Sequence, residues 1–126
     1  MSDAEFTSAQ SLILEGEQQK RDGDFEAAIV TFSRVLELPL EASPERNTLR
    51  AYALSLRGVA YTKTDKLTQA IDDLTSAIQI APERPLAYLH RAEVWEQLGE
   101  EDQALDDYAK AIKLDPEIKS LKQRRF

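Results

Sequence analysis

Two stretches of the chain match each other when one is moved 34 residues along the sequence. The identical pairs include Arg57 with Arg91, Gln69 with Gln103, Ala70 with Ala104, Asp72-Asp73 with Asp106-Asp107, Ala77-Ile78 with Ala111-Ile112, and Pro82-Glu83 with Pro116-Glu117. A fixed period of this length indicates stacked units, each of which buries its apolar face against its neighbours. The sequence therefore predicts a repeat architecture with a repeated binding surface, rather than a catalytic cleft.

Apolar residues recur at steps of three and four along most of the chain, and Gly, Pro and Asp interrupt this pattern at regular places. An example of the spacing is Phe25, Ala28, Ile29, Phe32, Val35 and Leu36. This period is that of an amphipathic helix. The pattern predicts helices at 8–21, 25–37, 45–63, 67–80, 85–98 and 101–114. Because most of these helices are near or below the ~12–15 residues at which an isolated helix is marginal, packing must stabilise them.

Two helix starts carry recognisable local signals. Thr7 followed by Gln10 is typical of a capping box. In this motif each of the two side chains accepts a hydrogen bond from the backbone N–H of the other residue. Ser43 before Pro44 predicts an N-cap with proline in the first helical position.

Composition excludes several classes of protein. The net charge is −7, but residues 119–126 contain four basic residues and no acidic one, so residues 1–118 carry 12 basic and 23 acidic residues, a net charge of −11. An acidic body repels phosphate backbones, so we expect no nucleic-acid partner. The chain has no apolar run long enough for a membrane span, no secretory leader and no cysteine, so we expect a cytoplasmic protein without disulfides or thiolate metal sites.

Residues 51–118 resemble the tetratricopeptide repeat family, whose units are helix-turn-helix pairs of 34 residues. The residues that carry the resemblance in the second unit, 51–84, are Leu54, Gly58, Tyr61, Ala70, Leu74, Ala77 and Pro82. In the third unit, 85–118, they are Tyr88, Ala92, Trp95, Ala104, Tyr108, Ala111 and Pro116. The resemblance implies an all-α fold, a right-handed α-solenoid of three antiparallel helix pairs plus a short C-terminal helix.

The first unit, 9–42, departs from the pattern in two places. It has Leu12, Gly16, Ala28, Phe32 and Val35, but Gln19 replaces the expected aromatic residue and the exit proline, Pro39, comes one residue early. Ala28 and Ala70 are 42 residues apart, so eight extra residues separate the first two units. We expect this insertion around 39–47, where it lengthens the loop and adds a turn to the third helix. Residues 1–7 are then an N-terminal extension, 8–118 a three-repeat domain, and 119–126 a basic cap or tail.

Small residues are expected where the helices of a unit approach each other closely. Gly58 and Ala92 allow this approach, and Ala70 and Ala104 lie where the opposing helix crosses and a larger side chain would overpack.

Aromatic and acidic residues of the repeat could suggest a ligand or metal site, but a structural role explains them better. Tyr61, Trp95 and Tyr108 recur at helical spacing, which favours core positions between helices over a ligand-stacking cage. The Asp72-Asp73 and Asp106-Asp107 pairs suggest a metal or acid-base site, but neighbours on a helix point about 100° apart. We therefore expect these pairs to lie on a solvated helical face.

The resemblance also implies a concave groove, lined by the first helices of successive units, in which the family binds extended peptides or helices. The matching residues are Ile13, Glu17, Lys20, Tyr52, Ser55, Leu56, Val59, Lys63, Leu86, Leu89, His90, Glu93 and Gln97, accompanied by Gln10, Leu14, Thr62 and Glu96. This face is expected to mix exposed apolar side chains with carboxylates.

One subgroup of the family grips the acidic C-termini of chaperones with Lys, Asn and Arg side chains. The matching positions hold Ile13, Glu17, Leu56, Leu86 and His90, so this clamp is not present. A carboxylate ligand would meet Glu17 and Glu93, and like charges placed together cost several kcal/mol. The expected partner is an apolar protein segment with basic flanks, not an acidic chaperone C-terminus.

No pattern in the chain predicts an enzyme or a cofactor site. His90 is the only histidine, so it cannot form a usual metal site alone, and the four glycines form no phosphate-binding loop. The sequence favours a non-catalytic scaffold or adaptor that binds a protein or peptide. A structural or self-associating subunit is the alternative.

The C-terminal segment has two interpretations. Ile118, Leu121 and Arg125 form one side of a short helix that covers the apolar edge of the third unit. Alternatively, the basic and apolar tail 119–126 binds the groove of another copy and makes a homo-oligomer whose stability falls with salt.

Overall fold

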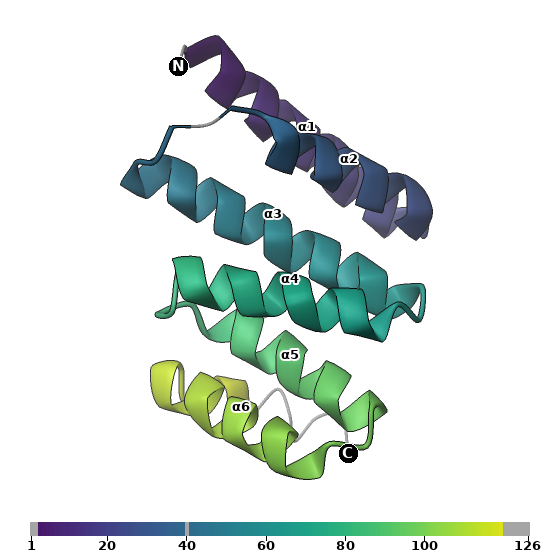
Figure 1. The fold of residues 1–126 in the computed structure, drawn as a ribbon, viewed down its shortest axis with the longest axis vertical. Helices are drawn as coiled ribbons and strands as arrows, with labels where there is room; N and C mark the ends of the chain where they lie inside the picture. The colour runs from purple at the N-terminus through teal and green to yellow at the C-terminus, as the bar shows by residue number, and fades with distance from the viewer. Residues whose placement is uncertain (1–2, 40, 120–126) are drawn as a thin grey trace.

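The computed structural model describes residues 3–39 and 41–119, and these residues form six α-helices and no strand (Figure 1). The helices are α1 (Asp3–Arg21), α2 (Phe25–Glu37), α3 (Pro44–Lys63), α4 (Leu67–Ile80), α5 (Pro85–Gln97) and α6 (Glu101–Leu114). They stack in sequence order along the long axis of the molecule, and each packs against the next (Figure 1). Contacts of α3 with α1 and with α5 connect the first helices of the three pairs. The predicted all-α solenoid of three helix pairs is confirmed.

Helix α1 is the one whose start differs from the prediction by more than a residue. It begins at Asp3 rather than at residue 8, so Thr7 and Gln10 both lie inside the helix and the predicted capping box is wrong. A tertiary contact accounts for the difference, because the guanidinium carbon of Arg46 in α3 lies 5.2 Å from the ring centroid of Phe6. The first turns of α1 are therefore stabilised by the start of α3, which a local sequence signal does not report.

The insertion between the first two units lies mainly in α3. This helix has 20 residues against 13 in α5, and it begins at Pro44, seven residues before the periodic equivalent of Pro85. Seven residues are about two turns of helix, so the helix gains more than the single turn expected from the sequence. The predicted N-cap is confirmed, because the backbone N–H of Arg46 donates to Ser43 Oγ at 3.2 Å and Pro44 is the first helical residue.

The same backbone conformation turns the chain in all three pairs. Gly23, Asp65 and Gly99 have φ angles of 81°, 61° and 80°, the left-handed region that favours glycine and tolerates Asp. The N–H of the following residue donates to the carbonyl five residues earlier at 2.8, 2.8 and 2.9 Å. This is the Schellman arrangement, which satisfies carbonyl groups that the helix end leaves free. The first pair therefore turns as the other two do, despite its weaker sequence pattern.

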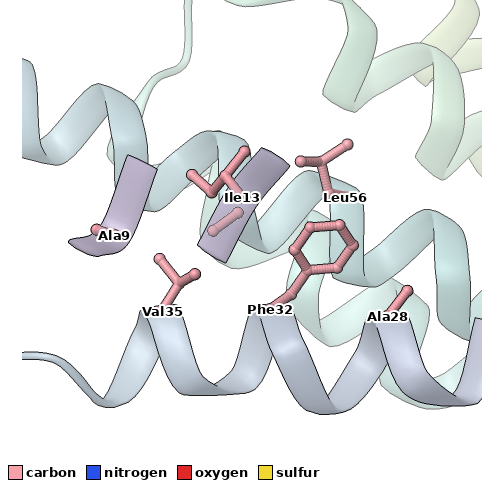
Figure 2. Packing of buried hydrophobic residues seen from close by; sticks show 7 residues of the cluster. Ala9, Ile13, Ala28, Phe32, Val35 and Leu56 are labelled. Carbon is pink, nitrogen blue, oxygen red and sulfur yellow. The ribbon is translucent and has the colours of Figure 1, made fainter. Parts of the chain in front are cut away.

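A large side chain fits against a small residue where the two helices of a pair cross. A Cβ atom on Gly16 would lie 2.4 Å from Phe32 Cε1, and a Cβ atom on Gly58 would lie 2.9 Å from Leu74 Cγ. Figure 2 shows Phe32 and Val35 of α2 beside Ile13, with Leu56 of α3 close by in the same cluster. The core of the first pair thus continues into the second pair.

The other predicted core positions are confirmed. Ala70 and Ala104 are fully or almost fully buried where the helices of their pairs cross. Tyr108 is buried, and the partly buried rings of Tyr61 and Trp95 pack against buried clusters. These aromatic residues are therefore core residues, and no ligand-stacking role is needed to explain them.

The end of the described chain covers part of the third pair. Ile118 has 1% of its surface exposed and packs with Tyr88, Ala104 and Tyr108. Ile118 and Lys119 are helical. The rest of the predicted C-terminal helix, with Leu121 and Arg125, and nearly all of the basic tail lie outside the described residues.

Candidate functional site

A pocket of about 210 Å³, here called the central pocket, lies on the first helices of the pairs. Its lining residues are Lys20, Ala51, Tyr52, Ser55, Leu56, Val59, Ala77, Arg84, Leu86, Ala87 and His90. It lies where α1, α3 and α5 come together, and Arg84, just before Pro85 in the loop from α4 to α5, completes it. All three helix pairs thus contribute to one site.

Two further pockets continue the central pocket in opposite directions. The Lys63 pocket, about 200 Å³, is lined by Val59, Thr62, Lys63, His90, Glu93 and Gln97. The Leu49 pocket, about 230 Å³, is lined by Glu45, Thr48, Leu49, Tyr52 and Arg84. Since Val59 and His90 are shared with the first and Tyr52 and Arg84 with the second, the three pockets form a continuous row. Glu45, Thr48 and Leu49 belong to the extra turns of α3, so the insertion lengthens this row.

Ten of the thirteen groove residues expected from the sequence line the central or Lys63 pocket. They are Lys20, Tyr52, Ser55, Leu56, Val59, Lys63, Leu86, His90, Glu93 and Gln97. Ile13, Glu17 and Leu89 do not line either pocket.

The groove was expected to mix exposed apolar side chains with carboxylates, and three of its apolar residues are buried instead. Ile13, Leu56 and Leu89 are only 5%, 6% and 6% exposed. Ile13 and Leu56 belong to one buried cluster between the first two pairs. Leu89 packs in the cluster that contains Ile118. Ile13 and Leu56 thus join the first two pairs, whereas Leu89 packs mainly inside the third pair. Leu86, 53% exposed, is the most exposed large apolar residue that lines the three pockets.

Arg84 is a pocket residue that the sequence reasoning missed. It precedes Pro85 at the start of α5, outside the helix positions that carry the repeat pattern. Its guanidinium carbon lies 5.7 Å from the centroid of the Tyr52 ring, a distance at which the cation interacts favourably with the ring face. The proline that begins the helix marks the preceding residue as a loop position, and this is the signal that could have identified it.

The charged side chains that line the central pocket are basic. Among the described residues, no carboxylate forms an ion pair with Lys20 or Arg84. Both side chains are partly buried. The central pocket therefore offers no carboxylate that could bind the basic residues expected to flank the ligand's apolar segment.

The two carboxylates expected to repel an acidic ligand are each held by a neighbour. The Tyr52 hydroxyl donates to Glu17 Oε2 at 3.0 Å. Burial raises the pKa of Tyr52, and the bond to Glu17 raises it further. In the Lys63 pocket, Glu93 Oε1 lies 3.1 Å from His90 Nδ1. Exclusion of an acidic partner by Glu17 and Glu93 is therefore not supported at the central pocket.

The acidic pairs of the repeat are not solvated as a whole. Asp72 and Asp106 are exposed, but Asp73 and Asp107 are only 6% exposed, so the expectation is wrong for one member of each pair. Arg57 Nε donates to Asp73 Oδ2 at 2.7 Å. The equivalent contacts of Arg91 with Asp107 are 2.7 and 2.8 Å. The 34-residue recurrence of Arg and Asp together was the signal for this pairing.

Each of these arginines also reaches the preceding helix pair. Arg57 Nη1 donates to Ser33 Oγ at 3.0 Å, and Arg91 Nη1 donates to Thr75 Oγ1 at 3.1 Å. The bonds to the carboxylates raise the pKa of both guanidinium groups above the usual value for arginine. These partly buried charges therefore have a structural role, within each pair through Asp and towards the preceding pair through Ser33 or Thr75.

The part of the chain that the structure describes has neither a metal-binding cluster nor a membrane-spanning helix. Residues 3–39 and 41–119 contain no cluster of three His, Asp or Glu side chains placed to bind a metal ion. No helix in these ranges has the length and apolar character needed to cross a bilayer.

Sequence comparison identifies the repeats directly. Residues 51–84 and 85–118 each match the pattern described as "Tetratricopeptide repeat". The chain belongs to the tetratricopeptide repeat family. The two matches cover the second and third helix pairs. The first pair belongs to the same array by its turn, its core and its contacts with α3.

Relatives of this tetratricopeptide repeat protein are mostly longer proteins. A "DnaJ homolog subfamily C member 7 homolog" from Dictyostelium discoideum is 31% identical over 110 residues, 87% of this chain and 20% of the relative. A "Tetratricopeptide repeat protein 36 homolog" from Nematostella vectensis is 33% identical over 81 residues, 64% of this chain and 45% of the relative. This chain therefore spans less than half the length of either relative.

Solved structures support the same fold. The Arabidopsis OM64 TPR domain superposes with a TM-score of 0.80 at 20% identity and covers 95% of both chains, a likeness that shows the fold alone. The second TPR of Spaghetti (RPAP3), solved bound to the HSP90 peptide SRMEEVD, has a TM-score of 0.75 at 25% identity. It covers 86% of this chain and 87% of that one.

Proposed function

We propose that this chain is a non-catalytic interaction scaffold that binds a peptide or helical segment of a partner protein along α1, α3 and α5. The observation that carries the proposal is the continuous row of three pockets, which all three helix pairs build together. An extended segment is long enough to occupy neighbouring pockets with successive side chains, whereas a compact small molecule would fill one.

The chemistry of the site and the comparisons support a binding role. The pocket walls combine apolar groups from Val59 and Leu86 with the polar groups of Ser55 and His90, a combination that suits side-chain recognition. The second TPR of Spaghetti is bound to a peptide in its solved structure, which supports peptide binding as the class of activity. The identity of the partner is a separate matter, because one fold serves many functions.

The test uses a matched pair of exposed apolar residues. Leu86, 53% exposed, lines the central pocket, whereas Val30, 61% exposed on α2, lines none of the three pockets. Peptides selected by the wild-type protein from a displayed random library are expected to bind Val30→Asp normally and Leu86→Asp at least about tenfold more weakly, which corresponds to about 1.4 kcal/mol. Circular dichroism would check that both variants keep the wild-type helicity.

Two results would overturn the proposal. If the wild-type protein enriches no peptide, or if Leu86→Asp binds the enriched peptides as tightly as Val30→Asp does, the row of pockets is not the binding surface.

A structural role is the second candidate, and one observation at the C-terminal edge favours it. Leu105 is 60% exposed, whereas the matching Ile71 packs against the cluster that holds Val94 of the next pair. Leu105 lines a shallow pocket with Glu96, Glu101, Ala104 and Tyr108, so this edge could stack on another helix or another copy. Sedimentation of the wild-type chain, Leu105→Lys and a chain without residues 119–126 at low and high salt tests this role. A monomer under every condition would contradict self-association.

A further inference from the structure

The central pocket contains positive charge that the protein does not neutralise. Lys20 and Arg84 are partly buried, and no carboxylate of the described residues pairs with either of them. The contrast is with Arg57 and Arg91, which are also partly buried but each bind an Asp carboxylate. A partly desolvated cation without a counter-charge interacts strongly with a carboxylate that approaches it.

Apolar surface adjoins these two cations. Val59, Leu86 and Ala87 line the same pocket, which is large enough for a single side chain of a ligand. A ligand that places an apolar side chain here therefore brings the neighbouring residue of its own chain close to Lys20 or Arg84.

We propose that the central pocket recognises an acidic side chain next to an apolar one in the bound segment, with Lys20 and Arg84 binding the carboxylate. The inference rests on the function proposed above and names the chemistry of its ligand. It also replaces the basic flanks that the sequence favoured, because the nearby carboxylates of Glu17 and Glu93 are engaged by Tyr52 and His90.

The carboxylate comes from a side chain within the segment and not from a chain terminus. The central pocket opens into the Lys63 pocket on one side and the Leu49 pocket on the other, so a bound chain can continue in both directions. Arg84 lies between the central and Leu49 pockets, where the middle of such a chain would pass. Two of the residues at the chaperone-clamp positions, Ile13 and Leu56, are buried and uncharged, and a third, Glu17, is acidic.

The overall charge of the protein does not decide this local preference. Residues 1–118 carry a net charge of −11, which slows the approach of an acidic peptide at long range. The Debye length is about 8 Å at physiological ionic strength, so distant charges are screened, while a contact in a partly buried pocket is screened much less. Lys20 and Arg84 therefore set the preference once the ligand is in contact.

The experiment uses random 12-residue peptides displayed with linkers at both ends, so that no terminal carboxylate is present. The wild-type protein is expected to enrich peptides with Asp or Glu beside Leu, Ile, Met or Phe. In an enriched peptide, synthesised with blocked ends, replacing the acid by its amide is expected to weaken binding about tenfold or more, in line with a hydrogen bond to a charged group.

The partner cations are tested by a double-mutant cycle. The combined variant Lys20→Gln with Arg84→Gln should bind the acidic peptide and its amide form equally, whereas Lys110→Gln, on the exposed surface of α6, should retain the full preference. Arg84→Gln is compatible with folding, since the Arg84 side chain caps no helix group. Melting curves of the three variants check that they fold.

The outcomes separate this inference from the function on which it rests. Enriched peptides that Leu86→Asp fails to bind, but that lack acids or tolerate the amide, overturn the acidic preference and leave the groove function in place. Peptides enriched in Lys or Arg flanks also overturn it. A library from which nothing is enriched overturns both.

Discussion

The first helix pair and the two later pairs have the same apolar design but different polar contacts. Phe32 against Gly16 in the first pair matches Leu74 against Gly58 in the second, and all three pairs turn through a residue with positive φ. The arginine that joins each later pair to the one before it has no counterpart in α1, where Glu15 occupies the position.

The buried aspartate is replaced in the first pair as well. Thr31 occupies the position of Asp73 and Asp107, and its hydroxyl donates to Gln19 Oε1 at 2.7 Å. Gln19 takes the place of the aromatic residue that the sequence pattern led us to expect. The comparison teaches that burial of small and large residues defines the unit, whereas the arginine of each later pair binds an Asp of its own pair and also a hydroxyl group of the preceding pair. Among the described residues, α1 has no preceding pair to join.

The largest expected effect tests whether the first pair shares the packing of the others. Ala28 and Ala104 are 0% and 2% exposed at equivalent positions. Ala28→Glu and Ala104→Glu should each destabilise the protein by about 4 kcal/mol or more, because each overpacks the crossing and buries an unpaired charge. Urea unfolding would measure both. A wild-type melting curve for either variant would show that the assigned crossing of that pair is wrong.

The next effect separates the polar contacts. Asp73→Asn leaves the Arg57 guanidinium without its counter-charge and should cost about 3 kcal/mol, the lower end for breaking a buried pair, since Arg57 keeps some solvent contact. Thr31→Ala removes a neutral hydrogen bond in the first pair and should cost about 1 kcal/mol. Chemical denaturation of both variants checks the difference. Equal losses would mean that the contact of Arg57 with Asp73 is no stronger than the neutral bond.

A smaller effect compares the helix crossings. Gly16→Ala places a methyl group 2.4 Å from Phe32 Cε1 and should cost about 1–2 kcal/mol, as expected for overpacking. Gly58→Ala meets Leu74 at 2.9 Å, so a smaller shift suffices and the gain in helix propensity of about 1 kcal/mol offsets more of the strain. Thermal unfolding would rank the two. A larger loss of stability from Gly58→Ala would show that the crossing at Gly58 is packed more tightly than the crossing at Gly16.

The smallest effect appears in alkaline solution. Burial raises the pKa of Tyr108, and the hydrogen bond to Glu96 raises it further. A tyrosine in the unfolded chain ionises near pH 10, so the stabilising contribution of Tyr108 is complete below about pH 10 and is lost as the pH rises further. Tyr108→Phe, which copies the Phe32 of the first pair, should flatten this loss. Urea titrations at pH 8, 10 and 10.5 measure it, and identical pH slopes would contradict the assignment.

Much of the fold was predictable because each unit repeats a local pattern. The ends of α2, α4 and α6, the Ser43 cap and the burial of Ala70 and Ala104 all follow from residues close in sequence or one period apart. The start of α1 was not predictable, because it depends on the contact between Phe6 and Arg46, which is distant in sequence and has no counterpart in the repeat.

The candidate site was predicted as a surface but not in its chemistry. Helical spacing placed Ser55, Val59 and Leu86 in the pockets, yet it could not distinguish them from Ile13 and Leu89, which are buried and line none of the three pockets. A shift of one position along the helix decides whether a side chain faces the groove or packs against a neighbouring helix. That decision depends on how the units stack.

The sequence by itself determined that this chain consists of helix pairs that bury their apolar sides against one another, because the period of 34 residues and the small residues at the crossings are written in it. Only the tertiary structure decided which charges face the binding surface. It pairs Glu17 with Tyr52 and leaves Lys20 and Arg84 at the central pocket, since the electrostatics of a groove depend on side chains that reach it from separate helices and loops.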